Sequence, residues 1–341
     1  MYQRFYRLRE LPFELTPNPR YLFLTPQHRE ALSNLQYGLS SAKAMTVLIG
    51  EAGTGKTTLL HAALESEPCR NVTCVYLNNP TLLRQEFVEV LSDRFSLGRR
   101  ASESKAVLLG KLDSVLRERR ARGQITALVI DEAQALSGEL LEEIRLLANF
   151  ETSTEKLLPL VLAGQPELKD RLNEPSLRQL KQRITLRCEI TPFSLAETGA
   201  YIASRIQTAG GDAAKLFTRE AVRLIHEKSR GIPRVINVIC DNALVTGCGL
   251  ERHFVDHAMV VGVVRDFDLG ADKALEGDAT DLSDFVPRSD HAVGHTTVAT
   301  VDDKTATDGH AGDAHERFSM EPQRRRFSLF RGRRAAVSDL T

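Results

Sequence analysis

Residues 45–58 read MTVLIGEAGTGKTT, and this stretch decides the fold of the 341-residue chain. Met45 to Ile49 form a compact apolar run, rich in β-branched side chains and ended by Gly50, which is typical of a fully buried parallel strand. The residues from Thr57 to Leu64 have the pattern of a helix. The stretch therefore predicts a buried strand joined to a helix by a glycine-rich turn.

The turn matches the pattern GxxxxGK[ST] at every fixed position. Glycines let backbone N–H groups wrap phosphates, Lys56 places a charge between the β- and γ-phosphates, and Thr57 offers a hydroxyl to Mg²⁺. The alternative, a glycine-rich turn without a ligand, does not explain the position between strand and helix. We predict that the phosphates are bound by Gly50, Glu51, Ala52, Gly53, Thr54, Gly55, Lys56, Thr57 and Thr58.

A second apolar run, Ala127 to Ile130, ends in Asp131 and Glu132. These acids would lie at the carboxyl edge of the sheet, where open α/β sheets bind ligands. We expect Asp131 to hold Mg²⁺ through its waters and Glu132 to polarise the attacking water as a general base. An acidic helix cap is the alternative interpretation of the pair.

The rest of the first 192 residues alternates strands with helices, which implies βαβ units and a parallel sheet. Further strands are expected at Thr73–Leu77, Leu157–Ala163 and Thr185–Ile190, and helices at His28–Leu39, Leu82–Phe95 and Lys105–Arg122. After Pro192 only helices are expected, at Leu195–Thr208, Thr218–Ser229, Ile232–Cys248 and His253–Arg265. We therefore expect an N-terminal segment (1–40) packed on the nucleotide site, an α/β core (41–192) and a small helical lid (193–267).

Charge is distributed unevenly, although 45 basic and 45 acidic residues balance overall. Residues 266–316 carry 13 acidic and 3 basic side chains, whereas residues 317–341 carry 7 basic and 2 acidic ones. Few aliphatic residues remain here, so the composition predicts that 268–341 is a disordered acidic linker with a basic tip. Arginines alternate with apolar residues in Arg324–Arg334, a candidate contact for anionic lipid headgroups; nucleic acid and a merely solvated tail are the alternatives.

Several classes of protein are disfavoured. The apolar run that comes nearest to a membrane span, Met259–Val264, is far shorter than the ~20 residues that a span needs. The first residues of the chain lack the apolar core of a signal peptide. Five cysteines without a CxxC pair indicate packed thiols rather than a metal site or disulfide framework. We expect a cytoplasmic protein, with the basic tip as a candidate peripheral contact to the inner membrane.

The motifs GEAGTGKTT, LVIDEAQ, LVLAGQPEL, LRQLKQRI and GIPRVIN, in this order, resemble those of a P-loop AAA+ ATPase. The N-terminal FYRLRELPFELTPNPRYLFLTPQHREALSNLQYGL is similar to the general secretion pathway protein A group, which includes ATPases of exosortase and polysaccharide export loci. The likeness covers about residues 1–265. It implies ATP and Mg²⁺ as cofactors, a homo-oligomeric ring, and secretion or export proteins of the envelope as partners. Secretion members continue into a transmembrane segment and a peptidoglycan-binding domain, whose patterns are absent here, so peptidoglycan binding is not expected.

The resemblance implies further roles in hydrolysis. Gln165 matches the polar sensor-1 position, and Arg234 matches sensor 2, projecting from the lid towards the nucleotide. Arg183 is the first choice for the arginine finger that reaches a neighbouring subunit, and Arg178 is the second. The plain alternatives are a loop glutamine, a solvated arginine at a helix start, and an ion pair within one subunit.

Three N-terminal residues, Pro12, Phe13 and His28, match the region that packs near the adenine in related ATPases. Pro12 and Phe13 are equally compatible with ordinary core contacts.

Two other functions remain alternatives to an ATPase that drives assembly of a secretion or export apparatus. A DNA-acting AAA+ ATPase, of the transposition-targeting or origin-recognition type, has a similar core. The signature PFxLTPxPRYLF favours secretion, and no winged-helix pattern follows residue 265. The third possible function is a nucleotide-dependent switch with little turnover. The intact Asp131–Glu132 pair argues against it.

Overall fold

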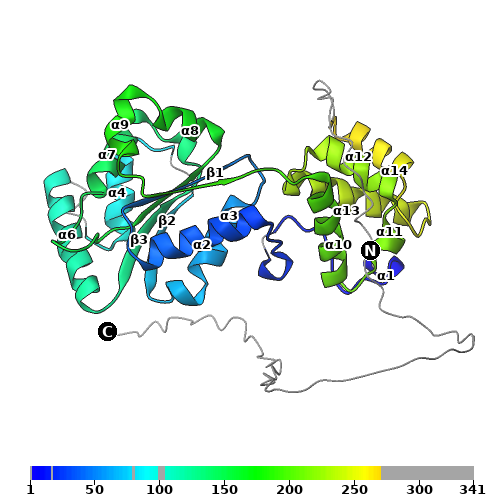
Figure 1. Ribbon diagram of the computed structural model, residues 1–341, viewed down its shortest axis with the longest axis horizontal. Coiled ribbons are helices and arrows are strands. Elements are labelled where there is room, and N and C mark those ends of the chain that lie inside the picture. The colour runs from blue at the N-terminus through cyan, green and yellow to red at the C-terminus, as the bar shows by residue number, and fades with distance from the viewer. Residues whose placement is uncertain (1, 17, 79–80, 99–103, 270–341) are drawn as a thin grey trace, which may run out of the picture. The chain divides into compact units, whose positions relative to one another are not determined.

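The computed structural model describes residues 2–16, 18–78, 81–98 and 104–269 (Figure 1). The acidic linker and the basic tip expected beyond residue 269 lie outside this part of the chain. None of the helices within it has both the length and the apolar character needed to cross a bilayer.

A parallel five-stranded sheet forms the centre of the α/β core, with the strand order β2-β3-β4-β1-β5. The predicted α/β class, a parallel sheet flanked by helices, is confirmed (Figure 1). The strands are β1 (Met45–Gly50), β2 (Val72–Leu77), β3 (Ile125–Ile130), β4 (Leu160–Gly164) and β5 (Leu186–Ile190). The sheet aligns strand ends closely: Ile49 of β1 pairs with Gly164 of β4, and Ile130 of β3 pairs with Leu162.

Strand β4 begins at Leu160, so the prediction of a strand from Leu157 was wrong at its start. Leu157 and Leu158 are buried but lie outside the ladder. Pro159 has no N–H to donate to a neighbouring strand, which delays regular pairing until the next residue. The apolar run therefore indicated correctly that these residues are buried, but it did not indicate where the strand begins.

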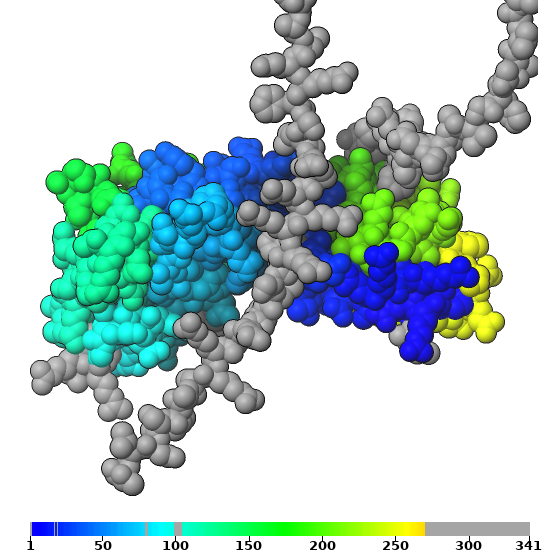
Figure 2. All heavy atoms as spheres, turned by 90° about the horizontal axis from the view of Figure 1, so that it is seen from below, coloured from blue at the N-terminus to red at the C-terminus, as the bar shows by residue number. Residues whose placement is uncertain are grey.

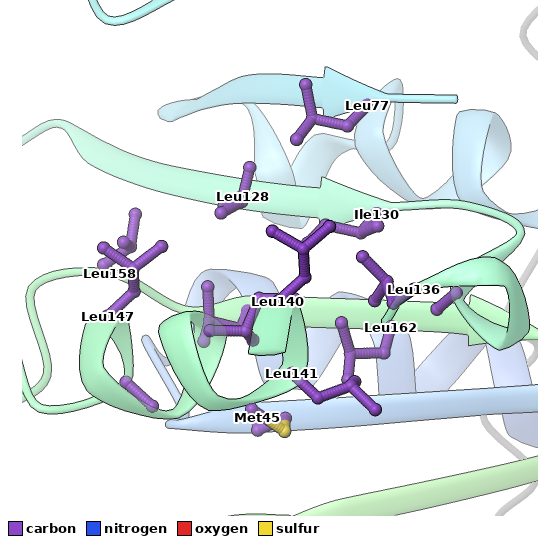
Figure 3. Close-up of a cluster of buried hydrophobic side chains, with 14 of the residues drawn as sticks. Met45, Leu77, Leu128, Ile130, Leu136, Leu140, Leu141, Leu147, Leu158 and Leu162 are labelled. Carbon is purple, nitrogen blue, oxygen red and sulfur yellow. The ribbon is translucent and has the colours of Figure 1, made fainter. Parts of the chain in front are cut away.

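The two faces of the sheet are both covered, which explains why its central strands read as continuous apolar runs. On one face, α2 (Pro26–Ser40) and α3 (Lys56–Leu64) share a core with Leu48, Val129 and Ala163. On the other face, Met45, Leu128 and Leu162 pack with leucines of further helices (Figure 3). These helices include α4 (Arg84–Arg94), α6 (Lys105–Ala121), α7 (Gly138–Leu147), α8 (Pro166–Leu172) and α9 (Arg178–Lys181).

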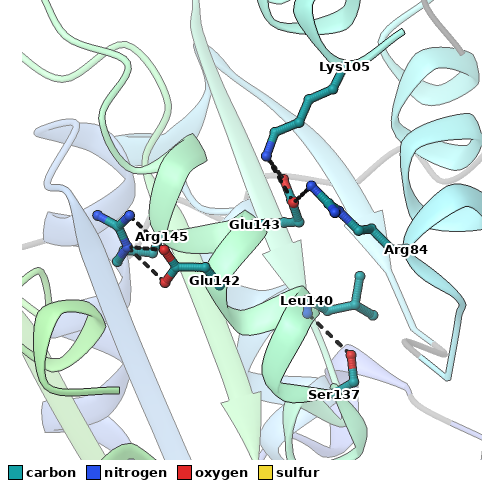
Figure 4. Close-up of polar contacts among 7 residues, drawn as sticks. All are labelled: Arg84, Lys105, Ser137, Leu140, Glu142, Glu143 and Arg145. Carbon is teal, nitrogen blue, oxygen red and sulfur yellow. Dashed lines mark hydrogen bonds and ion pairs between the residues drawn. The ribbon is translucent and has the colours of Figure 1, made fainter. Parts of the chain in front are cut away.

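Helix α7 was not predicted. It buries Leu140, Leu141 and Leu147 against the sheet (Figure 3), and Ile144 is buried as well. Its N-cap is the Ser137 hydroxyl, which accepts from the Leu140 N–H at 3.2 Å (Figure 4). The apolar residues recur at helical spacing, so the pattern was present in the sequence.

The Glu143 carboxylate joins α7 to two neighbouring helices, α4 and α6. Glu143 pairs with Arg84 of α4 at 2.7 Å and with Lys105 of α6 at 2.8 Å (Figure 4). The Glu143 side chain is only 11% exposed, and two cations compensate its burial.

The lid is entirely helical in the described residues, with its own hydrophobic core. It consists of α10 (Leu195–Thr208), α11 (Ala213–Leu216), α12 (Arg219–Ser229), α13 (Pro233–Gly249) and α14 (His257–Asp266). The helix expected from His253 begins four residues later, because Asp256 caps it by accepting from the Met259 N–H at 3.0 Å.

The N-terminal segment packs along the lid, beginning with the short helix α1 (Tyr2–Phe5). Tyr2 hydrogen-bonds Asp241 of α13, and the Tyr6 hydroxyl donates to the Arg252 carbonyl at 3.0 Å. Figure 2 shows these first residues, in dark blue, lying against the yellow and green helices of the lid. Residues 2–13 of the segment thus share the core of the lid, whereas α2 shares that of the sheet.

Candidate functional site

A cavity of about 430 Å³ lies between the glycine-rich turn, the N-terminal segment and the lid. It begins at the carboxyl edge of the sheet, where β1 ends in the turn and β3 ends in two acids. Its lining includes Gly53, Thr54, Gly55, Lys56, Thr57, Thr58, Glu132, His28, Phe193, Tyr201, Arg205, Arg234 and Asn237.

Two glycines of the turn have left-handed backbone conformations that suit glycine alone, with φ of +82° at Gly53 and +100° at Gly55. A Cβ at Gly53 would lie 2.8 Å from the Cβ of Arg234, whose N–H donates to the Gly53 carbonyl at 3.2 Å. A Cβ at Gly55 would meet nothing within 4 Å. Gly53 therefore permits close contact with the lid. Gly55 leaves open space at the start of α3, within the phosphate-binding cradle expected from residues 50–58.

Lys56 is 5% exposed, and its Nζ donates to the carbonyls of Gly50 at 2.8 Å and Glu51 at 3.0 Å. Burial lowers the pKa of the Lys56 ammonium, an effect that Glu132 and Asp131 oppose. A buried cation held mainly by neutral carbonyls gains much from an anionic ligand. The side chain is thus suited to a phosphate in the cradle.

Asp131 and Thr57, the two residues expected at the metal, are in contact: the Thr57 hydroxyl donates to Asp131 Oδ2 at 2.6 Å. The Tyr76 hydroxyl of β2 donates to the same oxygen at 2.8 Å. Burial, together with the bond to Asp131, raises the pKa of Tyr76, so the phenol stays a donor. A hydroxyl beside a carboxylate, both hard oxygen donors, fits Mg²⁺. Sequence reasoning missed Tyr76.

Glu132 lines the cavity with a left-handed backbone, φ +53°, which is strained for a residue with a side chain. Its Oε2 accepts from Gln134 Nε2 at 2.6 Å and from Gln165 Nε2 at 3.4 Å. Gln165 therefore lies beside the proposed base, at the N-cap of α8. Gln134 was not singled out from the sequence.

Arg234 enters the cavity from the first turn of α13, where the Gly231–Pro233 break begins the helix. Arg183 and Arg178 do not line the cavity. Arg178 is exposed on α9, and Arg183 is half-buried in the turn after it. Lys156 and, more weakly, Arg183 lower the pKa of the Glu151 carboxyl. Arg183 therefore interacts electrostatically with one acidic residue of its own chain.

His28 connects α2 to the cradle. Its Nδ1 lies 2.7 Å from the Thr25 hydroxyl and its Nε2 lies 3.3 Å from the Thr54 carbonyl. Burial lowers the pKa of His28, which favours a neutral ring that donates from Nε2 to the carbonyl and accepts at Nδ1. His28 thus holds the cradle from outside the turn.

Pro12 and Phe13 are core contacts in the structure. Phe13 is buried in the hydrophobic core of the lid, with its ring edge-on to Phe217 at 6.2 Å between centroids. The Pro12 carbonyl accepts from Arg205. Neither residue lines the cavity.

The far end of the cavity is aromatic with a few fixed polar groups. The Arg205 guanidinium lies 4.7 Å from the Tyr21 ring centroid, and its Nη1 donates to the Tyr201 hydroxyl at 2.6 Å. That hydroxyl donates to Asn237 Oδ1 at 2.9 Å. Sequence reasoning missed these residues. Tyr21 and Asn237 stand in the quoted stretches PRYLF and GIPRVIN but were given no role, and Tyr201 and Arg205 lie in no quoted motif.

Comparisons with known proteins agree with this geometry. Residues 39–172 match the AAA domain family. Over 257 residues the chain is 40% identical to General secretion pathway protein A of Aeromonas hydrophila, a match covering 75% of this chain and 47% of that protein. The chain thus spans about half the length of this relative, and the expected resemblance to AAA+ ATPases of this group is confirmed.

Solved structures of low sequence identity share the fold. ORC2 of Aeropyrum pernix has a TM-score of 0.56 and 16% identity, covering 75% of this chain and 71% of that chain. Cdc6p of Pyrobaculum aerophilum has a TM-score of 0.58 and 18% identity, covering 75% and 70%. The core thus has the P-loop AAA+ fold.

Proposed function

We propose that this chain, which carries an AAA domain, binds ATP with Mg²⁺ and hydrolyses it to ADP and phosphate. Lys56 would bind the β- and γ-phosphates from within the cradle of residues 50–58. Thr57 and Asp131 would hold Mg²⁺, which neutralises charge on the phosphates when bound. Glu132 would accept the proton of the attacking water, with Gln165 and Arg234 near the γ-phosphate.

One observation carries this proposal: Lys56, the Thr57–Asp131 pair and Glu132 converge on one cavity edge from two separate segments, the start of α3 and the end of β3. A glycine-rich turn alone could serve a structural purpose. A buried lysine beside a hydroxyl–carboxylate pair, with a carboxylate at the cavity surface, supplies the groups of a single subunit that phosphoryl transfer uses.

The aromatic end of the cavity supports a nucleotide rather than a simple phosphate. Tyr21, Phe193 and Tyr201 offer flat apolar surface, and Asn237 and Arg205 offer polar groups. This combination suits a purine base. We place the adenine there, between the N-terminal segment and the lid.

For the biological process, the 40% identity to General secretion pathway protein A supports assembly of an envelope secretion or export apparatus. Such a role would place the chain on the cytoplasmic side of the inner membrane, with partners among the envelope proteins. The similarity to ORC2 and Cdc6p, at 16% and 18% identity, carries only the fold and so does not support a DNA-acting role.

We also propose a ring of identical subunits, because Arg183 and Arg178 lie outside their own cavity. In a ring, the preferred finger Arg183 could reach the γ-phosphate bound by the next subunit.

Two variants test the chemical part of the proposal. Lys56→Ala should lose ATP binding, since the phosphate charge loses its partner. Glu132→Gln should bind ATP with affinity near that of the wild type and release phosphate at least ~100-fold more slowly, because an amide cannot accept the proton of the water.

Equilibrium binding of a fluorescent ATP analogue and phosphate release would be measured on the same purified proteins. Undiminished turnover in Glu132→Gln would remove Glu132 from the role of base. Wild-type turnover no greater than that of Lys56→Ala would overturn ATP hydrolysis itself. Secretin, exosortase or polysaccharide-export genes beside this gene would support the process, and a transposase gene would contradict it.

A further inference from the structure

The side chain of Gln134 has two directed hydrogen bonds, one at each end of its amide. Its Nε2 donates to Glu132 Oε2 at 2.6 Å, and its Oε1 accepts from the Gln165 N–H at 3.1 Å. A carboxylate can only accept and a backbone N–H can only donate, so these partners fix the orientation of the amide. Gln134 therefore joins the end of β3 to the start of α8 through a single side chain.

The backbone around Gln134 is held as firmly as its amide. It lies in the 3₁₀ turn η3 (Ala133–Ala135), whose N-cap is the strained Glu132. Arg171 of α8 donates through Nη1 to the Gln134 carbonyl at 2.8 Å and also bonds the Leu136 carbonyl. The turn cannot shift without breaking these contacts with α8.

The space around the Gln134 amide is limited by the neighbouring end of β4. A Cβ at Gly164, the last residue of β4, would lie 3.0 Å from Gln134 Oε1. A larger residue would crowd the amide. Glycine at this position thus leaves room for Gln134 to lie between the ends of β3 and β4.

These contacts determine which oxygen of the Glu132 carboxylate is hydrogen-bonded to protein. Both glutamine amides donate to the same oxygen, Oε2, at 2.6 and 3.4 Å. Among the described residues, no hydrogen bond is made to Oε1. One oxygen is thus fixed by protein donors, while the other is left to accept from a water.

We propose that Gln134 is a positioning residue for ATP hydrolysis: it orients the Glu132 carboxylate so that its second oxygen faces the attacking water. This inference rests on the proposed ATPase function and adds a residue to it. Gln134 does not line the cavity, so it acts through Glu132, which does. Loss of its orientation should slow the chemical step and leave ground-state nucleotide binding intact, since misplacement by about 1 Å can cost ~10²-fold.

The two ends of the amide can be tested separately. Gln134→Glu keeps an oxygen that can accept from the Gln165 N–H, but it replaces the donor to Glu132 by a second carboxylate. Gln134→Met keeps the approximate length and shape of the side chain and removes both bonds. A purely structural role, in which Gln134 only anchors the Gln165 backbone, predicts that Gln134→Glu remains active.

We expect both variants to lose kcat by ~10- to 100-fold, with KM and the affinity for a fluorescent ATP analogue within about two-fold of wild type. Gln124→Glu and Gln124→Met, at an exposed glutamine before β3, are matched controls that should keep wild-type kcat. Thermal melting of all variants would show whether each is folded.

Wild-type kcat in Gln134→Glu would overturn the proposal, whether or not Gln134→Met is active. A larger effect on nucleotide affinity than on kcat would also overturn it. If Gln134→Met fails to fold, the kcat of Gln134→Glu alone decides the outcome. Failure of the proposed function looks different, because the wild type would then release no phosphate beyond the Lys56→Ala background.

Discussion

At the residue scale, the proposed magnesium site involves a side chain that belongs to no nucleotide-binding motif. Tyr76 donates to the same Asp131 oxygen as Thr57, and its ring stacks on His61 of α3 at 5.4 Å between centroids. Asp131 is only 3% exposed. The phenol thus helps to orient a buried carboxylate that would otherwise depend on Thr57 and on the backbone N–H of Glu132.

Tyr76→Phe should weaken Mg²⁺ binding in the nucleotide complex by about 10-fold, because the donor that orients Asp131 is lost while the ring remains. The measurement is a Mg²⁺ titration of phosphate release and of fluorescent-nucleotide binding. Nucleotide affinity in the presence of EDTA serves as the control and should match wild type. An unchanged Mg²⁺ midpoint would show that Tyr76 contributes packing alone.

The sequence predicted site residues where chemistry requires a fixed spacing. Lys56, Thr57, Asp131 and Glu132 could be found this way, since phosphates and metals constrain residue type and separation closely. Gln134 could not, although it follows Glu132 by two residues. Its contact depends on the left-handed backbone of Glu132, and a single sequence does not indicate that a glutamate adopts that conformation.

At the element scale, one buried arginine of the lid adds to the contacts that hold the N-terminal segment in place. Arg205 of α10 donates to the carbonyls of Pro12 and Glu14 and to the Tyr201 hydroxyl. It is 7% exposed, and it also lines the cavity. Its guanidinium therefore joins the N-terminal segment, the lid and the proposed adenine end.

Arg205→Ala should destabilise the protein by about 2–4 kcal/mol, because it leaves buried carbonyls without donors and removes stacking over Tyr21. It should also weaken nucleotide affinity, since the N-terminal wall of the cavity loosens. Thermal or urea unfolding with and without nucleotide would measure both effects.

Arg70→Ala provides the control for Arg205→Ala. Arg70 is 69% exposed in its ion pair with Glu67, so its loss should change the free energy of unfolding by less than ~1 kcal/mol. Equal destabilisation by the two variants would contradict the clamping role of Arg205.

Elements were predicted well where burial alone determines them. β1 and β3 are buried along their whole length, so their apolar runs gave their positions. Interactions between distant residues were harder to predict, as in the packing of α1 on α13, two segments far apart in the sequence. The start of α14 was misplaced for a local reason, the Asp256 cap. Helix α7, by contrast, had both a capping serine and helical spacing, and could have been found.

At the scale of the whole molecule, the side chains proposed to act in hydrolysis lie at one site of a single chain, except for the proposed arginine finger. The transition state spreads negative charge over the γ-phosphoryl oxygens, and an arginine supplied in trans increases kcat by ~10³-fold or more. Arg183 lies in the turn after α9, away from its own cavity. A ring therefore predicts that specific activity rises with protein concentration.

Mixing two inactive proteins tests the central claim, that this chain hydrolyses ATP at a site completed by its neighbour. Glu132→Gln has the finger but no base, and Arg183→Ala has the base but no finger. In mixed rings, an intact base can face an intact finger. We predict that phosphate release returns on mixing, to a fraction of wild type set by the number of restored interfaces. A mixture as inactive as its components, at concentrations where oligomers form by light scattering, would contradict the shared site with Arg183 as its finger.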